Sequence, residues 1–299
     1  MSELPDAFDL EECARYLREV AALASPILPI GEAALALASY ERPRVGLARY
    51  RQHLATIACD VGRHSGAGGD LAARVQALNE IILLKYRYSG DERTYDDLQN
   101  ANLMRVVDRR KGLPVALGIL YLHAARAQGW DSVGLGFPGH FLVRLTEGAE
   151  RLILDPFHGG RVSDAATLRE LLKAMAGQEV ELAPEHYAPV ADRDVLLRLQ
   201  NNLKSRLLQA GRHERALRTT ETMLLLAPDL AELWQEAGLL HARLGNMRAG
   251  VNALEQFIIQ RKRQRFAEGM AEMARDPQAM AIDRKISEEF SAADGDGVS

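Results

Sequence analysis

A run of residues that is apolar nearly all round is the feature that most constrains this fold. Residues 115–127 read VALGILYLHAARA, with apolar side chains on almost every face of a helix. Such a helix is stable only when other elements cover it, and the run is too short to cross a bilayer. Pro114 precedes it, and proline is tolerated at the first helical position because its missing N–H needs no partner there. The sequence therefore predicts a buried central helix starting near Pro114.

The segment that follows contains the only convincing β-strands of the sequence. Residues 133–137 alternate apolar residues with glycine, and residues 141–145 and 151–154 are short apolar runs on either side of TEGAE. A five-residue loop containing glycine is typical of an antiparallel hairpin. We therefore expect a small antiparallel sheet at about residues 133–157, packed against the central helix.

A histidine and an aspartate flank this hairpin in the motifs FPGHFLVR and LILDPFHGG. With the turn centred near Gly148, residues whose numbers sum to 295 or 296 face each other, so His140 and Asp155 are opposite or one place apart. Facing residues on neighbouring strands have their Cβ atoms about 4.5–5.5 Å apart. This geometry lets a carboxylate orient an imidazole as a general base.

The nucleophile that would complete such a site is missing. A thiol is best activated at a helix N-terminus, where the dipole lowers its pKa. The central helix offers Pro114, Val115 and Ala116 at that place, and none of these side chains can attack a substrate. The two cysteines, Cys13 and Cys59, lie among apolar residues of predicted helices, so we expect both to be buried and inert.

Other side chains near the hairpin suggest weaker alternatives. Arg109 and Arg144 are candidates for binding a carboxylate, although paired or solvated arginines are commoner. His158, in the turn FHGG, could join His140 and Asp155 as a metal-binding set, but no HExxH or CxxC spacing supports a metal. We expect no metal and no cofactor, with His158 as an exposed turn residue.

The C-terminal third repeats with a fixed period. Gly211 and Gly245 are 34 residues apart, as are Ala216 and Gly250. A period of 34 residues with small residues at the helix crossings is the tetratricopeptide pattern of paired helices. Two units are predicted, followed by a capping helix over 258–273.

Composition limits the class of partner and the compartment. The chain of 299 residues is 47% hydrophobic and 26% charged, with a net charge of −4. A mildly acidic protein does not gather nucleic acid or anionic lipid, so we expect neither partner, and the basic run 261–265 is interpreted as a solvated helix end. Two cysteines and an acidic N-terminus without a signal pattern favour the cytoplasm.

The motifs GLPVALGILY, FPGHFLVR and DPFHGG, in this order and followed by tetratricopeptide units, resemble the bacterial SirB-type branch of the transglutaminase-like superfamily. The resemblance extends to about residue 260. It implies an α+β fold: a papain-like core with a small antiparallel sheet and a C-terminal all-α tetratricopeptide superhelix. It also implies that His140 and Asp155 match two members of the family's Cys-His-Asp triad, with the cysteine position falling at residues 114–116.

These observations divide the chain into four predicted parts. Residues 1–90 form a mainly helical N-terminal region, residues 91–185 the core with the central helix and sheet, residues 191–275 the repeat module, and residues 276–299 a disordered tail.

The leading functional hypothesis is a non-catalytic protein that binds a protein or peptide through its degenerate groove and its repeats. One alternative is a hydrolase or acyltransferase that uses His140 and Asp155 without a cysteine. A third is a scaffold that only supports the repeats.

Overall fold

The apolar run folds as the central helix α6 (Pro114–Arg126), with Pro114 at its first position. Its residues from Pro114 through Leu122 are all buried, as predicted for a helix inside a domain. Gly118 is needed for close packing, because a Cβ there would lie 2.3 Å from the ring of Phe141. The central helix and the ring of Phe141 thus interlock.

The computed structural model describes residue 4, residues 9–65 and residues 69–276. The chain falls into two compact units, residues 1–228 and 229–299, which are described one after the other. The tail predicted as disordered lies outside the described residues, apart from Asp276.

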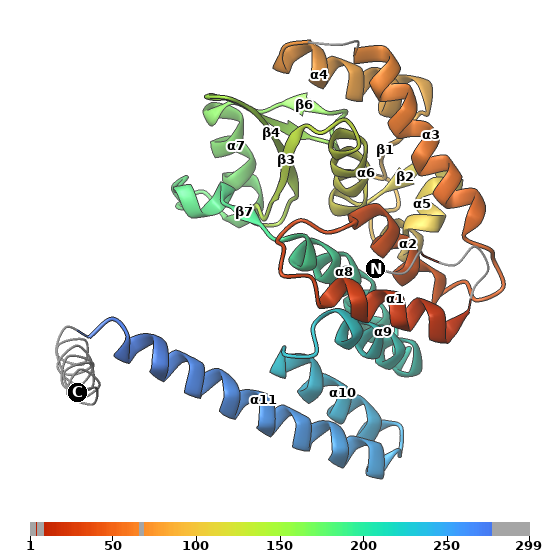
Figure 1. Cartoon of the computed structure of the whole chain (residues 1–299), viewed down its shortest axis with the longest axis vertical. Helices are drawn as coiled ribbons and strands as arrows, with labels where there is room; N and C mark the ends of the chain where they lie inside the picture. Colours follow the sequence, from red (N-terminus) through yellow and green to blue (C-terminus); the bar gives the residue numbers. More distant parts are fainter. Residues whose placement is uncertain (1–3, 5–8, 66–68, 277–299) are drawn as a thin grey trace, which may run out of the picture. The chain divides into compact units, whose positions relative to one another are not determined.

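A five-stranded antiparallel sheet forms the middle layer of the first unit, in the order β6-β5-β4-β3-β7. Helix α6 lies on one face and α7 on the other (Figure 1). Leu168 and Leu172 of α7 pack on Leu135 and Leu142 of the sheet. The strands are β3 (Asp131–Leu135), β4 (Leu142–Glu147), β5 (Glu150–Asp155), β6 (Arg161–Val162) and β7 (Pro189–Val190), and α7 is Ala165–Ala176.

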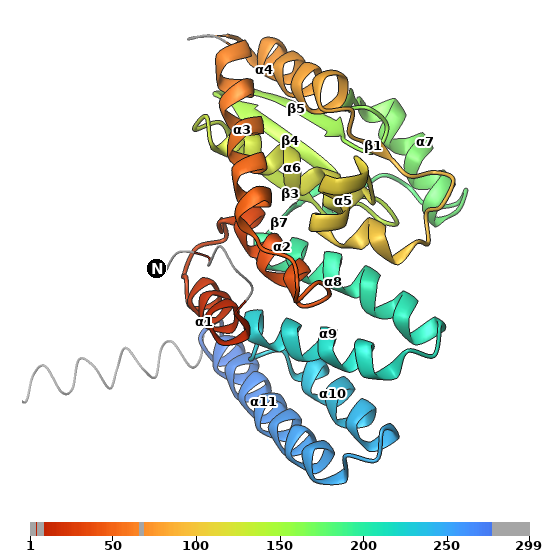
Figure 2. The ribbon, with the colours of Figure 1, turned by 90° about the vertical axis from the view of Figure 1, so that its right-hand side faces the viewer.

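Helices from the N-terminal half surround α6 on its other sides, and α3 runs alongside it (Figure 2). Asp9, Asp70 and Asn102 cap three of these helices, each accepting a hydrogen bond from a backbone N–H three residues on. The elements are α1 (Leu10–Ala21), α2 (Ile30–Ser39), α3 (Ala48–Ser65), α4 (Leu71–Leu78), the 3₁₀ turn η2 (Leu98–Ala101), α5 (Leu103–Arg109) and the parallel pair β1 (Ser89–Gly90) and β2 (Lys111–Gly112).

The helix predicted from Asp70 to about Lys85 is continuous, but its second half has a different winding. After Leu78 the chain continues as the π-helix η1 (Asn79–Lys85). π-helical segments are rare and are often found at functional sites. This one places Asn79 beside the turn that follows β5.

The hairpin between β4 and β5 is tighter than predicted. Glu147 pairs with Glu150, so the loop has two residues instead of five, and the register pairs Val143 with Leu154. Gly148 has φ +58° at the first loop position, as in a type II′ turn. The predicted facing of His140 and Asp155 within the ladder is therefore wrong, because β4 begins only at Leu142.

The repeats form pairs of neighbouring helices. Helices α8 (Asp192–Gln209) and α9 (His213–Leu226) lie side by side and belong to the first unit, after the 3₁₀ turn η3 (Pro184–Tyr187) (Figure 2). The second unit contains α10 (Ala231–Arg243) and α11 (Met247–Met273). The backbones of these two helices approach closely, since a Cβ on Gly250 would lie 3.1 Å from the Gly238 carbonyl oxygen. The predicted capping helix is the second half of α11.

Among residues 9–65 and 69–276, no helix combines the length and the apolar composition that crossing a bilayer requires.

His53 ties α3 to the segment around β1 and β2. Its Nε2 accepts a hydrogen bond from Arg110 at 2.6 Å and lies 2.9 Å from the hydroxyl of Tyr88, while the ring of Tyr86 meets it edge-on. Burial, and then the positive charge of Arg110, lowers the pKa of His53 to about 4.

This lowered pKa makes stability depend on pH. An unfolded histidine titrates near pH 6.5, so between there and pH 4 the unfolded chain binds more protons and His53 loses its stabilising contribution as the pH falls. From about pH 7 to pH 4, the free energy of unfolding should fall by about 2 kcal/mol more in the parent protein than in His53→Gln. Urea denaturation of both proteins across this pH range measures the difference. If the free energy of unfolding fell equally with pH in the two proteins, the prediction would be contradicted.

Candidate functional site

His140 and Asp155 meet although they are not paired in the sheet. His140 lies in the turn before β4, and Asp155 is the last residue of β5. The Nε2 atom of His140 is 2.9 Å from Oδ1 of Asp155, and the two residues are 3% and 1% exposed. The long reach of the imidazole compensates for the register, so the two groups that the sequence singled out form a buried hydrogen-bonded pair.

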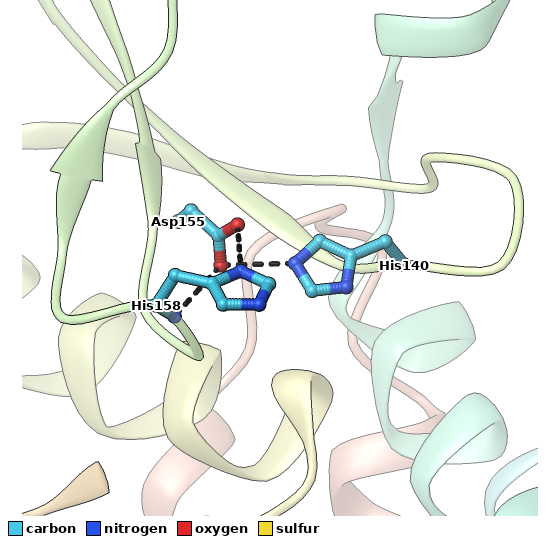
Figure 3. A group of neighbouring side chains, drawn as sticks. All are labelled: His140, Asp155 and His158. Atoms are coloured by element: carbon cyan, nitrogen blue, oxygen red, sulfur yellow. Dashed lines mark hydrogen bonds and ion pairs between the residues drawn. The ribbon is translucent and has the colours of Figure 1, made fainter. Parts of the chain in front are cut away.

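The Asp155 carboxylate also binds the turn that follows it. Its Oδ1 accepts hydrogen bonds from the backbone N–H groups of Phe157 and His158, and its Oδ2 lies 2.7 Å from Nδ1 of His158. Figure 3 shows the carboxylate held between the two imidazoles. The rings of His140 and His158 stack with centroids 5.4 Å apart. One carboxylate thus orients two histidines.

The pKa of Asp155 reflects this environment. Burial alone would raise it, but the hydrogen bonds and positive charge that His140 and His158 offer outweigh burial and hold it below its ordinary value. Asp155 therefore stays ionised and serves as an acceptor for both rings. Burial, and then the charge of Asp155, raises the pKa of the Tyr121 hydroxyl.

Two residues that the sequence analysis did not single out, Asn79 and Tyr121, support the turn that follows β5. The side-chain amide of Asn79 donates to the Gly160 carbonyl at 3.0 Å, and the Tyr121 hydroxyl donates to Asn79 Oδ1 at 2.9 Å. Gly160 in turn donates its N–H to the Asp155 carbonyl at 2.8 Å. Two features of the sequence could have identified them: Asn79 is a polar residue within an apolar helical pattern, and Tyr121 carries a hydroxyl within the apolar central helix.

A small pocket lies between His140 and the N-terminal tip of α6. Its volume is about 50 Å³, and its walls include His140, Leu113, Pro114 and Val115. The N-terminal tip of α6 therefore presents only hydrocarbon side chains beside the imidazole. Ala116 is buried and does not line this pocket.

Helix α8 forms the opposite wall through Arg198 and Asn202. The Arg198 guanidinium donates to the carbonyl oxygens of Phe137 and His140, at 3.2 and 2.7 Å. Burial lowers the pKa of Arg198. The turn that carries His140 is thus anchored by a helix almost 60 residues further along the chain, a contact that no local pattern predicts.

The two arginines that the sequence suggested as carboxylate-binding residues lie away from this pocket. Arg109 donates to Asp91 and Asn100, and Arg144 lies within β4 opposite Ile153, so neither lines the pocket at His140. His158 does join the site.

Neither cysteine lines the pocket at His140. Cys13 is buried in α1, where Ser39 donates to its sulfur at 3.8 Å. Cys59 is exposed, so its predicted burial was wrong, because it faces outward from α3 between the buried positions Ala58 and Asp60.

This arrangement of helix tip, histidine and aspartate, joined to helical repeats, defines a class. A model of the transglutaminase-like superfamily matches residues 48–201, and the chain belongs to that superfamily. A tetratricopeptide repeat model matches residues 203–279.

The relatives place the chain within the superfamily. A UPF0162 protein of Xylella fastidiosa is 35% identical over 191 residues, covering 62% of this chain and 67% of its own. Protein SirB1 of Salmonella typhimurium is 29% identical over 195 residues, covering 64% and 72%. Human F-box only protein 21 is 30% identical over 135 residues, covering 44% and 21%. With the repeats, these matches support the SirB-type branch.

Gly148 and Gly160 have similar φ angles but different surroundings, so substitutions at the two positions distinguish backbone strain from side-chain collision. Gly148 has φ +58° with nothing near its missing Cβ, whereas at Gly160, with φ +65°, a Cβ would collide with Asn79. Gly148→Ala should cost about 1 kcal/mol of stability, the left-handed backbone penalty. Gly160→Ala should cost about 2 kcal/mol more, because it also displaces Asn79. Denaturant titration compares the two, and equal losses would show that Asn79 does not support the turn.

A thiol at the helix tip tests whether His140 still faces the nucleophile position. Val115→Cys should have a lower thiol pKa than Ala116→Cys, because both positions are buried near the helix N-terminus but only Val115 lines the pocket at His140. Ala116→Cys, one residue on, is the matched control because burial acts on its thiol without contact with the pocket.

Ultraviolet absorbance of the thiolate against pH, with the parent protein subtracted, gives both values. Adding His140→Ala to Val115→Cys should raise the thiol pKa most of the way to that of Ala116→Cys. Equal pKa values at the two positions would contradict the inherited geometry.

Proposed function

We propose that this protein is a non-catalytic member of the transglutaminase-like superfamily that binds another protein. The observation that carries the proposal is the pocket at His140, which has hydrocarbon in place of a thiol and a volume of about 50 Å³. That volume admits a few water molecules and no peptide. The pocket therefore lacks both the nucleophile and the space for thiol-dependent acyl transfer.

A different cleft in the first unit suits a peptide better. It has a volume of about 220 Å³ and lies where η2 and α5 meet the end of α2 and the repeat helices α8 and α9. Leu98 and Leu203 supply apolar surface. The charged residues of the lining are Arg42, Arg105, Arg215, Glu41 and Asp97. Tetratricopeptide helices commonly form binding surfaces, so we assign the binding role to this cleft and the adjoining repeats.

Within the part of the chain that the structure describes, one arginine without an ion-pair partner favours an acidic segment of the partner, because the other charged residues of the cleft, Asp97 beside Arg109 included, are paired. Arg42 is paired with Asp108 and Arg215 with Glu41. The guanidinium of Arg105 is exposed and has no ion-pair partner among the described residues, so it is available to a carboxylate.

Photo-crosslinking in the native cells tests this role. A photoreactive amino acid at position 105 should give a discrete crosslinked adduct, and Arg105→Glu beside a probe at position 99 should abolish it. A probe at Arg93, an exposed arginine outside the cleft, is the matched control and should give no such adduct. Adducts that are identical at positions 105 and 93 would contradict binding in the cleft.

A hydrolase remains the second candidate, because the His140–Asp155 pair is intact and adjoins a pocket that can hold water. A general base contributes about 10²–10⁴-fold to a rate. The non-catalytic proposal predicts that the parent protein and His140→Ala hydrolyse a panel of amides, esters and thioesters at the same background rate. A rate lost in His140→Ala, with the fold intact by circular dichroism, would establish the hydrolase instead.

A further inference from the structure

We propose that His140, Asp155 and His158 form a binding site for one divalent transition-metal ion. Each residue offers one ligand atom, and these atoms all lie within 4.8 Å of one another. Two imidazole nitrogens and a carboxylate oxygen suit Zn²⁺, Fe²⁺ or Co²⁺, whereas Mg²⁺ and Ca²⁺ prefer oxygen ligands. This inference does not rest on the proposed binding of a partner.

The carboxylate is already oriented as a metal ligand. Its Oδ1 is fixed by the backbone N–H groups of Phe157 and His158, at 3.1 and 3.2 Å, which leaves Oδ2 directed toward His158. Metal ligands in proteins are commonly held by such outer hydrogen bonds. Asn79 fixes the Gly160 carbonyl in the same turn, so the backbone that carries Asp155 and His158 is held without the ion.

The burial of the three residues defines how an ion enters. His140 and Asp155 are buried, whereas the His158 side chain is 37% exposed and lies on the solvent side. Zinc bonds of about 2.0–2.1 Å bring tetrahedral ligand atoms to about 3.3 Å from each other. The exposed His158 ring can shift to meet this spacing, and water completes the coordination.

Binding requires a definite change in protonation. The ion replaces the hydrogens that now join the rings to Asp155, so His140 binds through Nε2 and carries its proton on Nδ1. His158 binds through Nδ1 and carries its proton on Nε2. A neutral ring only changes tautomer, and a charged ring releases one proton to solvent.

Titration of the chelator-treated full-length protein with Co²⁺ and Zn²⁺ tests the site. We expect one ion per chain by calorimetry, a visible Co²⁺ absorption band, and a higher melting temperature with Zn²⁺. His158→Ala should weaken binding by at least about 100-fold and abolish both the band and the thermal shift. Its exposure makes this substitution compatible with the fold, which circular dichroism verifies.

His64→Ala is the matched control, because His64 is an exposed histidine paired with one carboxylate, Glu80, at 2.7 Å. It should leave binding unchanged. If His158→Ala alone lowers the melting temperature of the metal-free protein, His158→Gln, which keeps a polar amide near Asp155 without an imidazole, is measured in its place. Equal affinity in the parent and the His158 variant, or no binding by the parent, would overturn the proposal.

Discussion

The burial of the Asp155 carboxylate is the constraint on which the rest of the site depends. An ionised group that is 1% exposed loses its hydration, and only hydrogen bonds and opposite charge can offset that loss. The chain supplies them from several directions: His140 before β4, and His158 and the amide of Phe157 in the following turn. Satisfying this one group therefore fixes the end of β5 and the entry to β4 together.

Local patterns predicted the elements but not their exact fit. The central helix and the strands follow from apolar periodicity, and the proximity of His140 to Asp155 follows from their positions on either side of a short turn. The register did not follow, because a two-residue loop depends on the backbone angle of Gly148. The supporting groups Asn79 and Arg198 act across long sequence separations, and no spacing rule reaches them. The sequence therefore indicated the His140–Asp155 pair, whereas the residues that surround the pair depend on tertiary packing.

Helix α8 forms part of the wall of the pocket at His140. Arg198 donates to two carbonyls of the His140 turn, and Asn202 lines the same small space. Helices α8 and α9 belong to the same compact unit as the sheet. The same helix lines the larger cleft through Leu203, the residue that follows Asn202. The walls of the small pocket at His140 and of the larger cleft therefore depend on the packing of one helix.

The second histidine contributes more to the site than compensation for the buried charge of Asp155. His140 and the amides of the turn satisfy Oδ1 of Asp155, and His158 satisfies Oδ2. A partly exposed ion pair adds only about 0–1 kcal/mol to stability. What two rings on one carboxylate provide, and one ring does not, is a set of three converging ligands. A metal ion would use all three at once, so the arrangement that offsets the burial of Asp155 is also the one that the proposed metal site needs.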